Sequence, residues 1–367
     1  DERLTGMTAE DLGWLLEEHL RVSPAVRSVG RRTIYLDEVQ VVDGWATLVR
    51  RLLDEGGTDI FVSGSSARLL SREVSTSLRG RSMEVLVHPF SFRESLRHAQ
   101  KEPTLTWNNL DNLGRAELDA QLRSYLETGG FPEAQTAAKR DRVALLSGYV
   151  DVMVLRDVID RHKVSNPEAL RRLQRHLLSN PGALFSVSKF YADLKSQGIP
   201  VAKDTLHAYL GHLEDAFLIR LASFHSASER KRSVNPRKAF PIDTGLIPIF
   251  ERGGRENRGR SLETVILLEL ERRGYTVTWI RSGKDLEVDF HAEQHGEKPL
   301  MIQVSLDTTD DATWAREVRA LQAAVESYPE ARAMLVTLDA APPARQLPRH
   351  IEWRPASRWL LENDIGD

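Results

Sequence analysis

The chain has 367 residues, of which 41% are hydrophobic and 28% charged, with a formal net charge of -3 and no cysteine. The length suffices for two to four modules that each bury a core, and the missing cysteines exclude disulfides and thiolate metal sites. The near-neutral charge does not indicate a partner, so any nucleic-acid site must be local. No apolar run approaches the roughly 18 residues of a membrane span. We therefore expect a cytoplasmic protein without a membrane partner.

The first part of the chain alternates strand and helix patterns. Thr8 is expected to cap a helix, residues 33–36 to form a buried strand, and residues 45–55 to form a second helix that ends at Gly56-Gly57. Another strand follows at residues 59–63. Strand, helix and strand at this spacing predict a βαβ unit with a parallel sheet. A further apolar strand is predicted at residues 83–87.

Two adjacent carboxylates, Asp37 and Glu38, directly follow the first of these strands. Open α/β sheets place their ligands at the carboxyl ends of strands. In phosphoryl-transfer ATPases such a Walker B pair holds Mg²⁺ with the first acid and polarises the attacking water with the second. We therefore predict that Asp37 and Glu38 bind the metal and that Glu38 is catalytic. An ordinary core strand followed by a polar turn is the alternative.

Hydroxyl and guanidinium groups follow farther along the same region. The second strand ends in a Ser-Gly-Ser-Ser turn, where Ser63 and Ser65 are candidates for orienting water, and a plain turn with a helix cap is the alternative. Arg81, with Arg79 behind it, is the candidate for neutralising charge on a transferring phosphoryl group. Two solvated arginines are the alternative for that loop.

Five segments carry a family resemblance. In chain order they are IYLDEVQ, VSGSSARLL, LRGRS, HPFSFRESL and YLETGGFPE. They resemble bacterial and archaeal AAA-type ATPases that carry a C-terminal domain of unknown function, and the resemblance covers nearly the whole chain. It implies ATP and Mg²⁺ as cofactors, an AAA-like core over residues 1–92 and a helical, lid-like subdomain over residues 93–180. AAA-type sites are often completed between subunits, so a homo-oligomer is a further expectation.

The family's phosphate-binding loop has no counterpart in the sequence. A Walker A loop has the pattern GxxxxGK followed by Ser or Thr, whereas the single Gly-Lys pair here is Gly283-Lys284 and Thr278 occupies the place of the first glycine. The family carries the loop upstream of a strand whose tail resembles residues 1–4. We therefore expect an N-terminally truncated form that does not bind ATP tightly by itself.

Residues 181–252 have the pattern of a winged helix. A short helix, a turn at Gly198, a helix from Lys203 to Ile219 and two strands around a basic hairpin tip predict this module. The residues expected to contact nucleic acid are Lys203, Thr205 and His207 of the second helix and Arg230, Lys231, Arg232, Arg237 and Lys238 of the tip. DNA is thus a predicted partner. Because winged helices also serve as protein-interaction modules, a protein partner is the alternative.

Residues 253–367 resemble the restriction-endonuclease-like core found in the same family. There a helix glutamate, a strand aspartate and an acid-x-lysine pair bind Mg²⁺ and activate water. The matching positions are Glu263 and Asp289, with Gln303 and Ser305 where the acid and the lysine would be. Glutamine is a poor Mg²⁺ ligand and serine supplies no cation. We therefore expect a degenerate nuclease site.

These observations predict an α/β protein with four parts: a partial P-loop core, a helical lid, a winged helix and an endonuclease-like domain. The predicted function is ATP binding and hydrolysis coupled to rearrangement of the winged-helix and nuclease-like region. The alternatives are a DNA-binding or protein-interaction module without catalysis, and a weak metal-dependent nuclease.

Overall fold

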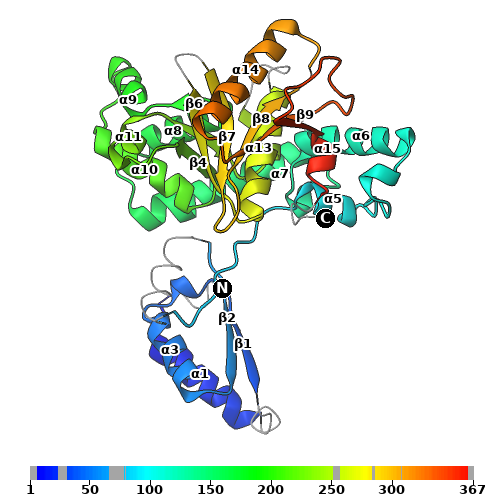
Figure 1. Cartoon of the computed structure of the whole chain (residues 1–367). Helices are drawn as coiled ribbons and strands as arrows, with labels where there is room; N and C mark the ends of the chain where they lie inside the picture. The colour runs from blue at the N-terminus through cyan, green and yellow to red at the C-terminus, as the bar shows by residue number, and fades with distance from the viewer. Residues whose placement is uncertain are drawn as a thin grey trace. The chain divides into compact units, whose positions relative to one another are not determined.

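The computed structural model describes residues 6–23, 31–65, 78, 80–250, 257–282, 286–306 and 308–362. The fold class is α/β, as predicted, with one two-stranded and one eight-stranded sheet among these residues. The chain divides into two compact units, one formed by residues 1–87 with Asp215–Phe217 and the other by the rest of residues 88–367 (Figure 1). Among the helices of the described ranges, none combines the length and the apolar character that crossing a membrane requires.

The first unit contains the predicted βαβ arrangement. Its elements are α1 (Ala9–Val22), β1 (Arg32–Leu36), the 3-10 helix η2 (Val39–Val41), α3 (Trp45–Glu55) and β2 (Thr58–Val62). Thr8 caps α1 as predicted, in a reciprocal capping box with Asp11. The strands β1 and β2 are parallel, with Leu36 opposite Val62. The carboxyl ends of both strands therefore lie at the same edge.

One face of this small sheet is covered and the other is open. Buried side chains of η2 and α3, including Val39, Trp45 and Val49, pack with Leu36 and Ile60 from the strands. On the other face Tyr35 and Phe61 stack with ring centroids 5.1 Å apart, and they are 75% and 57% exposed. A sheet that buries only one face leaves apolar side chains at the alternating positions in solvent.

The prediction of a third strand at residues 83–87 is wrong for this structure. These residues are described, but they belong to no strand and pair with neither β1 nor β2. Met83 and Val87 are 89% and 86% exposed. Strands are stabilised through a hydrogen-bonded neighbour and a buried face, and this segment has neither among the described residues.

The second unit begins with the helical region predicted between residues 93 and 180. Its helices are α5 (Phe92–His98), η3 (Trp107–Asn109), α6 (Asn112–Thr128), η4 (Pro132–Ala134), α7 (Lys139–Val152), the π-helical η5 (Met153–Asp160) and α8 (Pro167–Ser179). The Gly129-Gly130 break between α6 and η4 lies where the sequence predicts it.

The next elements, after α8, lie in the region predicted to be a winged helix. They are β3 (Leu184–Phe185), α9 (Val187–Ser196), α10 (Lys203–Asp215), β4 (Ile219–Phe224), α11 (Glu229–Val234) and β5 (Arg237–Pro241). Both β3 and β4 pair antiparallel with β5. The predicted basic hairpin tip is wrong in one respect, because much of it forms the helix α11. The hydroxyl of Ser228 caps this helix by accepting a hydrogen bond from the Lys231 N–H.

The C-terminal part contains two short helical segments and then an α/β region. Its elements are η6 (Thr244–Leu246), α12 (Ile247–Phe250), α13 (Asn257–Arg272), β6 (Thr276–Ser282), β7 (Leu286–Glu293), β8 (Leu300–Ser305), α14 (Asp311–Ser327), β9 (Arg332–Thr337), β10 (Ile351–Pro355) and α15 (Ala356–Trp359). The strand order is β10-β9-β8-β7-β6-β4-β5-β3, so β3, β4 and β5 continue the C-terminal sheet. The connection is the parallel pairing of β4 with β6.

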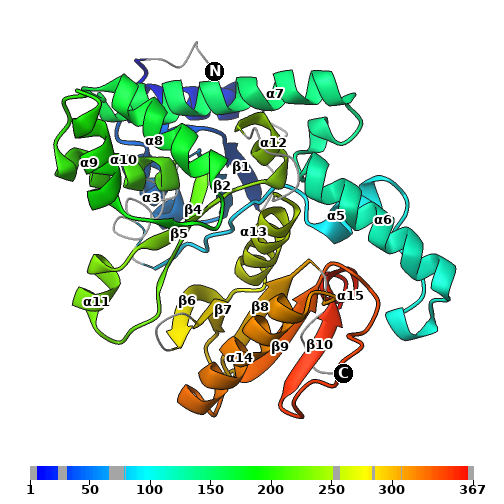
Figure 2. The ribbon, with the colours of Figure 1, turned by 90° about the horizontal axis from the view of Figure 1, so that it is seen from above.

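Two helices cover opposite faces of the C-terminal sheet (Figure 2). On β8 the side chain of Ile302 packs in the cluster that contains α13, whereas Met301 packs in the cluster that contains α14. Met334 and Leu335 of β9 divide in the same way. This alternation is the two-residue period of a strand that is buried on both faces. The result is a three-layer α/β/α arrangement.

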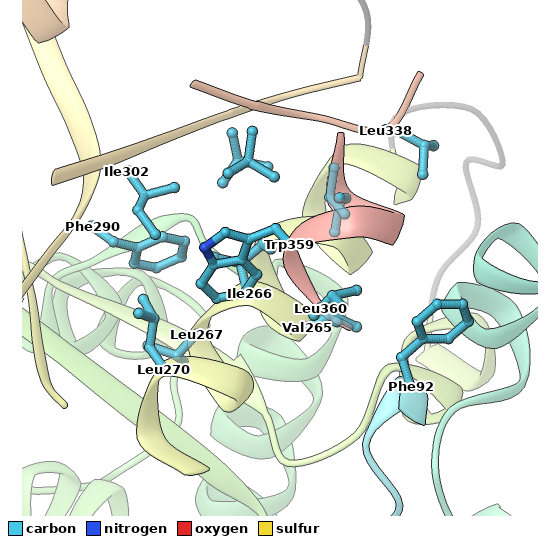
Figure 3. Packing of buried hydrophobic residues seen from close by; sticks show 14 of the residues in the cluster. Phe92, Val265, Ile266, Leu267, Leu270, Phe290, Ile302, Leu338, Trp359 and Leu360 are labelled. Atoms are coloured by element: carbon cyan, nitrogen blue, oxygen red, sulfur yellow. The ribbon is translucent and has the colours of Figure 1, made fainter. Parts of the chain in front are cut away.

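The α13 side contains the larger core. Trp359 of α15 packs among Ile266 of α13, Phe290 of β7 and Ile302 of β8 (Figure 3). Phe92 of α5 belongs to the same buried cluster. The N-terminal helices of this unit therefore share their core with the sheet.

Candidate functional sites

The first candidate site lies at the carboxyl ends of β1 and β2. Asp37 and Glu38 follow β1, Ser63 follows β2, and the Ser63 N–H donates to the Leu36 carbonyl at 2.9 Å. The Ser63 hydroxyl donates to Asp37 Oδ1 and accepts from the Glu38 N–H at 3.3 Å. The Ser65 hydroxyl lies 3.4 Å from Glu38 Oε2. The structure thus brings together four of the predicted side chains.

Glu38 has an unusual backbone conformation at this edge. Its φ of 50° and ψ of 37° lie in the left-handed region, which residues other than glycine seldom adopt. The conformation turns the chain from β1 into η2. Strained backbone of this kind is concentrated at functional sites, which agrees with the predicted role of the residue.

Of the two predicted arginines, Arg81 is described and does not lie at this edge. Arg81 donates to Asp54 Oδ1 at 2.9 Å, and Asp54 is in the last turn of α3. Since α3 returns the chain from the carboxyl end of β1 to the start of β2, its last turn lies at the opposite edge of the sheet, roughly 16 Å away along an 11-residue helix. Within the described residues Arg81 is thus not brought to Asp37. Arg79 lies outside the described residues.

The second candidate site surrounds Lys238 in the other unit. Its Nζ lies 2.7 Å from Glu287 Oε1 and 3.2 Å from Asp289 Oδ1, and the side chain is 3% exposed. Lys238 was predicted to lie in an exposed hairpin tip, and that placement is wrong. It belongs to β5, and its ammonium group is buried among the acids of the nuclease-like site.

Asp289 holds the nuclease-like site together from β7. Its Oδ1 faces Lys238, while its Oδ2 accepts hydrogen bonds from Gln303 Nε2 at 2.9 Å and from the Val304 N–H at 3.0 Å. Gln303 also accepts from the Asp289 N–H at 3.3 Å and donates to Glu317 of α14. Gln303 therefore acts as a bridge between two carboxylates.

Glu263 approaches the same cluster from α13. Burial and the negative charge of Asp289 raise the pKa of Glu263 well above its ordinary range. Burial by itself would lower the pKa of Lys238, but the charges of Asp289, Glu263 and Glu287 raise it above its ordinary value. Gly182 leaves room at this point, since a Cβ there would lie 2.7 Å from Glu263 Oε2. Ser305, the fourth predicted position, ends β8.

The structure supplies an ammonium group at the nuclease-like site, although the lysine of the family motif is missing from the sequence. The acid-x-lysine motif is replaced by Gln303 and Ser305, yet Lys238 places an ammonium group on Asp289 from a distant strand. The sequence analysis missed this role, as well as the participation of Glu287 and Glu317. A carboxylate two residues before Asp289 on the same strand was the available signal for Glu287. The carboxylates of Glu263, Glu287 and Asp289 around Lys238 offer the oxygen ligands that Mg²⁺ prefers. They therefore fit a Mg²⁺ site.

The remaining predicted nucleic-acid residues divide into two groups. Lys203 and His207 of α10 are exposed. Partial burial and the positive charges of Lys203 and Arg237 lower the pKa of His207. Thr205 is half-buried on the same helix. Arg230 and Lys231 are exposed on α11. Arg232 is instead held within its own helix by an ion pair with Glu229, and it donates to the Ser226 carbonyl at 3.0 Å.

The two sites define a class of protein, one that joins a hydrolase-like βαβ unit to a nuclease-like α/β unit. Family comparisons agree. Residues 1–96 match the model of an AAA domain, residues 119–253 that of a domain of unknown function, and residues 255–350 that of a restriction endonuclease.

Relatives are found in both archaea and bacteria. An uncharacterized protein of Methanocaldococcus jannaschii is 31% identical over 89% of this chain and 71% of its own length. An uncharacterized protein of Haemophilus influenzae is 32% identical over 83% of this chain and 72% of its own length. A crystal structure of a Vibrio cholerae protein covers 93% of this chain and 92% of its own, but at 12% identity its TM-score of 0.19 supports no structural argument. The chain belongs to the bacterial and archaeal family of AAA-type P-loop proteins with a C-terminal restriction-endonuclease-like domain.

Proposed function

We propose that the protein is a Mg²⁺-dependent ATPase that uses ATP to change the arrangement of its winged-helix and nuclease-like region. The observation that carries the proposal is the hydrogen-bonded set of Asp37, Glu38 and Ser63 at one sheet edge. Mg²⁺ would supply a charge that neutralises the phosphates, with Asp37 as its ligand. Glu38 would polarise the attacking water, and Ser63 fixes the orientation of Asp37.

The proposal requires a phosphate-binding loop. No GxxxxGK motif occurs in the 367 residues, and neither carboxylate can substitute for the backbone N–H groups and the lysine that hold phosphates in such a loop. In the family that the chain resembles, this loop lies upstream of a strand whose tail resembles residues 1–4. Arg81 would then act on the site of a neighbouring subunit, because within its own chain it is paired with Asp54.

The test measures ATP turnover and ATP binding on the protein together with the upstream sequence of its gene. Glu38→Gln is expected to reduce turnover by at least about 100-fold, the order expected for a group that acts on the nucleophile, while ATP still binds. Glu55→Gln, an exposed glutamate at the end of α3, is the matched control and should not change turnover. Wild-type turnover in Glu38→Gln would refute the role of Glu38.

A second candidate function is metal-dependent cleavage of a phosphodiester. The observation that favours it is the Lys238 ammonium group on Asp289, since cleavage requires a cation near the carboxylates that hold the metal. Asp289 and Glu263 would hold the ion, and Lys238 would stabilise charge at the cleaved phosphate. DNA is the proposed substrate because Lys203 and Arg237 offer positive charge on the adjoining module.

The nuclease candidate is tested with plasmid DNA and either Mg²⁺ or Mn²⁺. Cleavage is expected to disappear in Asp289→Asn and to persist in Glu330→Gln, which removes an exposed acid outside the site. If the wild-type protein leaves the plasmid intact with both ions, this second candidate is rejected, whereas the ATPase proposal is unaffected.

A further inference from the structure

Two histidines and a glutamate converge at the junction of β4, β6 and β7. His225 follows β4, whereas His291 and Glu293 belong to β7. Each offers a ligand atom, and these atoms all lie within 4.8 Å of one another. The imidazole centroids of His225 and His291 are 4.0 Å apart with an interplanar angle of 45°, so the rings are not arranged as a parallel stack.

The backbone fixes the three side chains before any ligand arrives. The His225 N–H donates to the Trp279 carbonyl of β6 at 2.8 Å. Thr278 of β6 is paired with His291, and Thr276 with Glu293, in the antiparallel ladder with β7. Ligands that strands hold in this way need little reorganisation to bind an ion.

Thr278 determines which nitrogen of His225 remains available. The hydroxyl of Thr278 donates its single proton to the His291 carbonyl at 3.1 Å. It lies 3.3 Å from His225 Nδ1, and because its proton is already used it must accept a hydrogen bond there. His225 is therefore protonated on Nδ1, which leaves a lone pair on Nε2. A hydrogen bond that fixes the tautomer in this way is the usual support of a metal-bound histidine.

His291 supplies the second, independent observation. It is 1% exposed, and its Nδ1 has no hydrogen-bond partner in the described part of the chain. Buried polar atoms are nearly always paired in folded proteins, so an unpaired imidazole nitrogen beside a second histidine needs an explanation. Glu293 is exposed at the end of β7, which gives an ion access from solvent.

We propose that His225, His291 and Glu293 bind a transition-metal dication of the Zn²⁺ class, with solvent completing the coordination. Two imidazoles and one carboxylate suit Zn²⁺, whereas Mg²⁺ and Ca²⁺ prefer sites built from oxygen alone. The site is distinct from the acid cluster, although Asp289 lies only two residues from His291 on β7.

Its test uses the full chain after removal of metal by a chelator, with Zn²⁺ as the probe in calorimetry and Co²⁺ as the probe in absorption spectroscopy. We expect one Zn²⁺ per chain and a Co²⁺ spectrum with visible bands from nitrogen ligation. His225→Ala and Glu293→Gln should each weaken Zn²⁺ binding at least tenfold. These two positions are half-buried and exposed, so the variants should keep the fold, as circular dichroism would verify.

Two control variants separate this site from its surroundings. Glu297→Gln removes an exposed acid of the turn after β7, and Asp289→Asn removes the central carboxylate of the nuclease-like site; both should bind Zn²⁺ as the wild type does. Absence of stoichiometric Zn²⁺ binding in the wild type would overturn the proposal. So would wild-type affinity in folded His225→Ala, or loss of binding in Asp289→Asn with retention in Glu293→Gln.

Discussion

At the scale of single residues, Lys238 differs most from the sequence-based expectation, because it is buried among carboxylates and not exposed at a hairpin tip. Lysines are rarely buried unless they are paired, and here the ammonium group lies between Glu287 and Asp289. Removing one partner of a buried ion pair leaves uncompensated charge in a poorly solvated environment. The side chain therefore supports the fold whether or not the site cleaves DNA.

Lys238→Met should lower the free energy of unfolding by about 3–5 kcal/mol, the usual result of breaking a buried pair. Chemical denaturation followed by the fluorescence of the buried Trp279 and Trp359 would measure the loss. Adding Asp289→Asn should recover part of it, because asparagine removes a charge and keeps an acceptor for the Val304 N–H. A Lys238→Met variant as stable as the wild type would contradict the description of this network.

The sequence predicts residues well where neighbours along the chain determine the site. Asp37 and Glu38 follow a strand directly, and the next strand returns to the same edge, so the contact with Ser63 follows from local order. Lys238 and Asp289 are separated by 51 positions, and nothing in the spacing indicates that β5 brings a lysine to β7. Its basic neighbours predicted a solvent-exposed tip instead.

At the scale of elements, the close backbone contacts of Gly130 explain why a glycine lies between α6 and η4. The Gly130 N–H donates to Asp243 Oδ2 at 2.5 Å, and the Phe90 N–H donates to the Gly130 carbonyl at 2.8 Å. Asp243 also accepts from the Gly245 N–H at 2.7 Å. Burial raises the pKa of Asp243 to about 6, although both N–H groups oppose the shift. The Asp243 carboxylate thus joins its own segment to Gly130, and the Gly130 carbonyl joins both to Phe90.

Gly130→Ala is expected to destabilise this unit by at least about 2 kcal/mol. The new Cβ would lie 2.1 Å from the Phe90 carbonyl oxygen, and a backbone atom cannot move aside as a flexible side chain would. Gly148→Ala is the matched control, since a Cβ at that position of α7 meets nothing within 4 Å. It should be neutral or stabilising by up to about 1 kcal/mol. Equal melting temperatures of the two variants would show that the close approach is absent.

The elements α10 and β5 give a prediction for DNA binding. If α10 and β5 present the basic group, Lys203→Ala with Arg237→Ala should weaken binding to duplex DNA of any sequence and lower the slope of log affinity against log salt by about 2, or about 1 per phosphate contact. Lys101→Ala, an exposed lysine just beyond α5, should leave the slope unchanged. Fluorescence anisotropy across a salt series measures this slope. An unaltered slope in the double variant would exclude this face as the DNA-binding surface.

Most helices and strands could be predicted from the sequence, but the strands with which they pair could not. Periodicity and caps located α1, α3, β1 and β2, because these depend on local pattern. The helix α11 was missed because a charged segment between two strands is typical of a hairpin tip. Residues 83–87 have the apolar, β-branched composition of a strand, but pairing depends on a neighbour that no local pattern reveals.

At the scale of the whole molecule, the family assignment joins an AAA domain to a restriction-endonuclease-like domain in one chain. Each unit has a core of its own, so each can keep its fold while the connection between them changes. The proposed function requires that nucleotide bound at residues 1–87 changes the conformation of residues 88–367. This coupling is the central claim of the proposed function.

The most direct test is hydrogen exchange on the Glu38→Gln protein with its upstream sequence, with and without ATP. This variant should hold ATP without hydrolysing it, so that the bound state persists through the measurement. The proposed function predicts that ATP changes exchange in α10, α11 or β5, as well as around Asp37. Exchange that changes around Asp37 and stays identical throughout residues 88–367 would contradict the coupling.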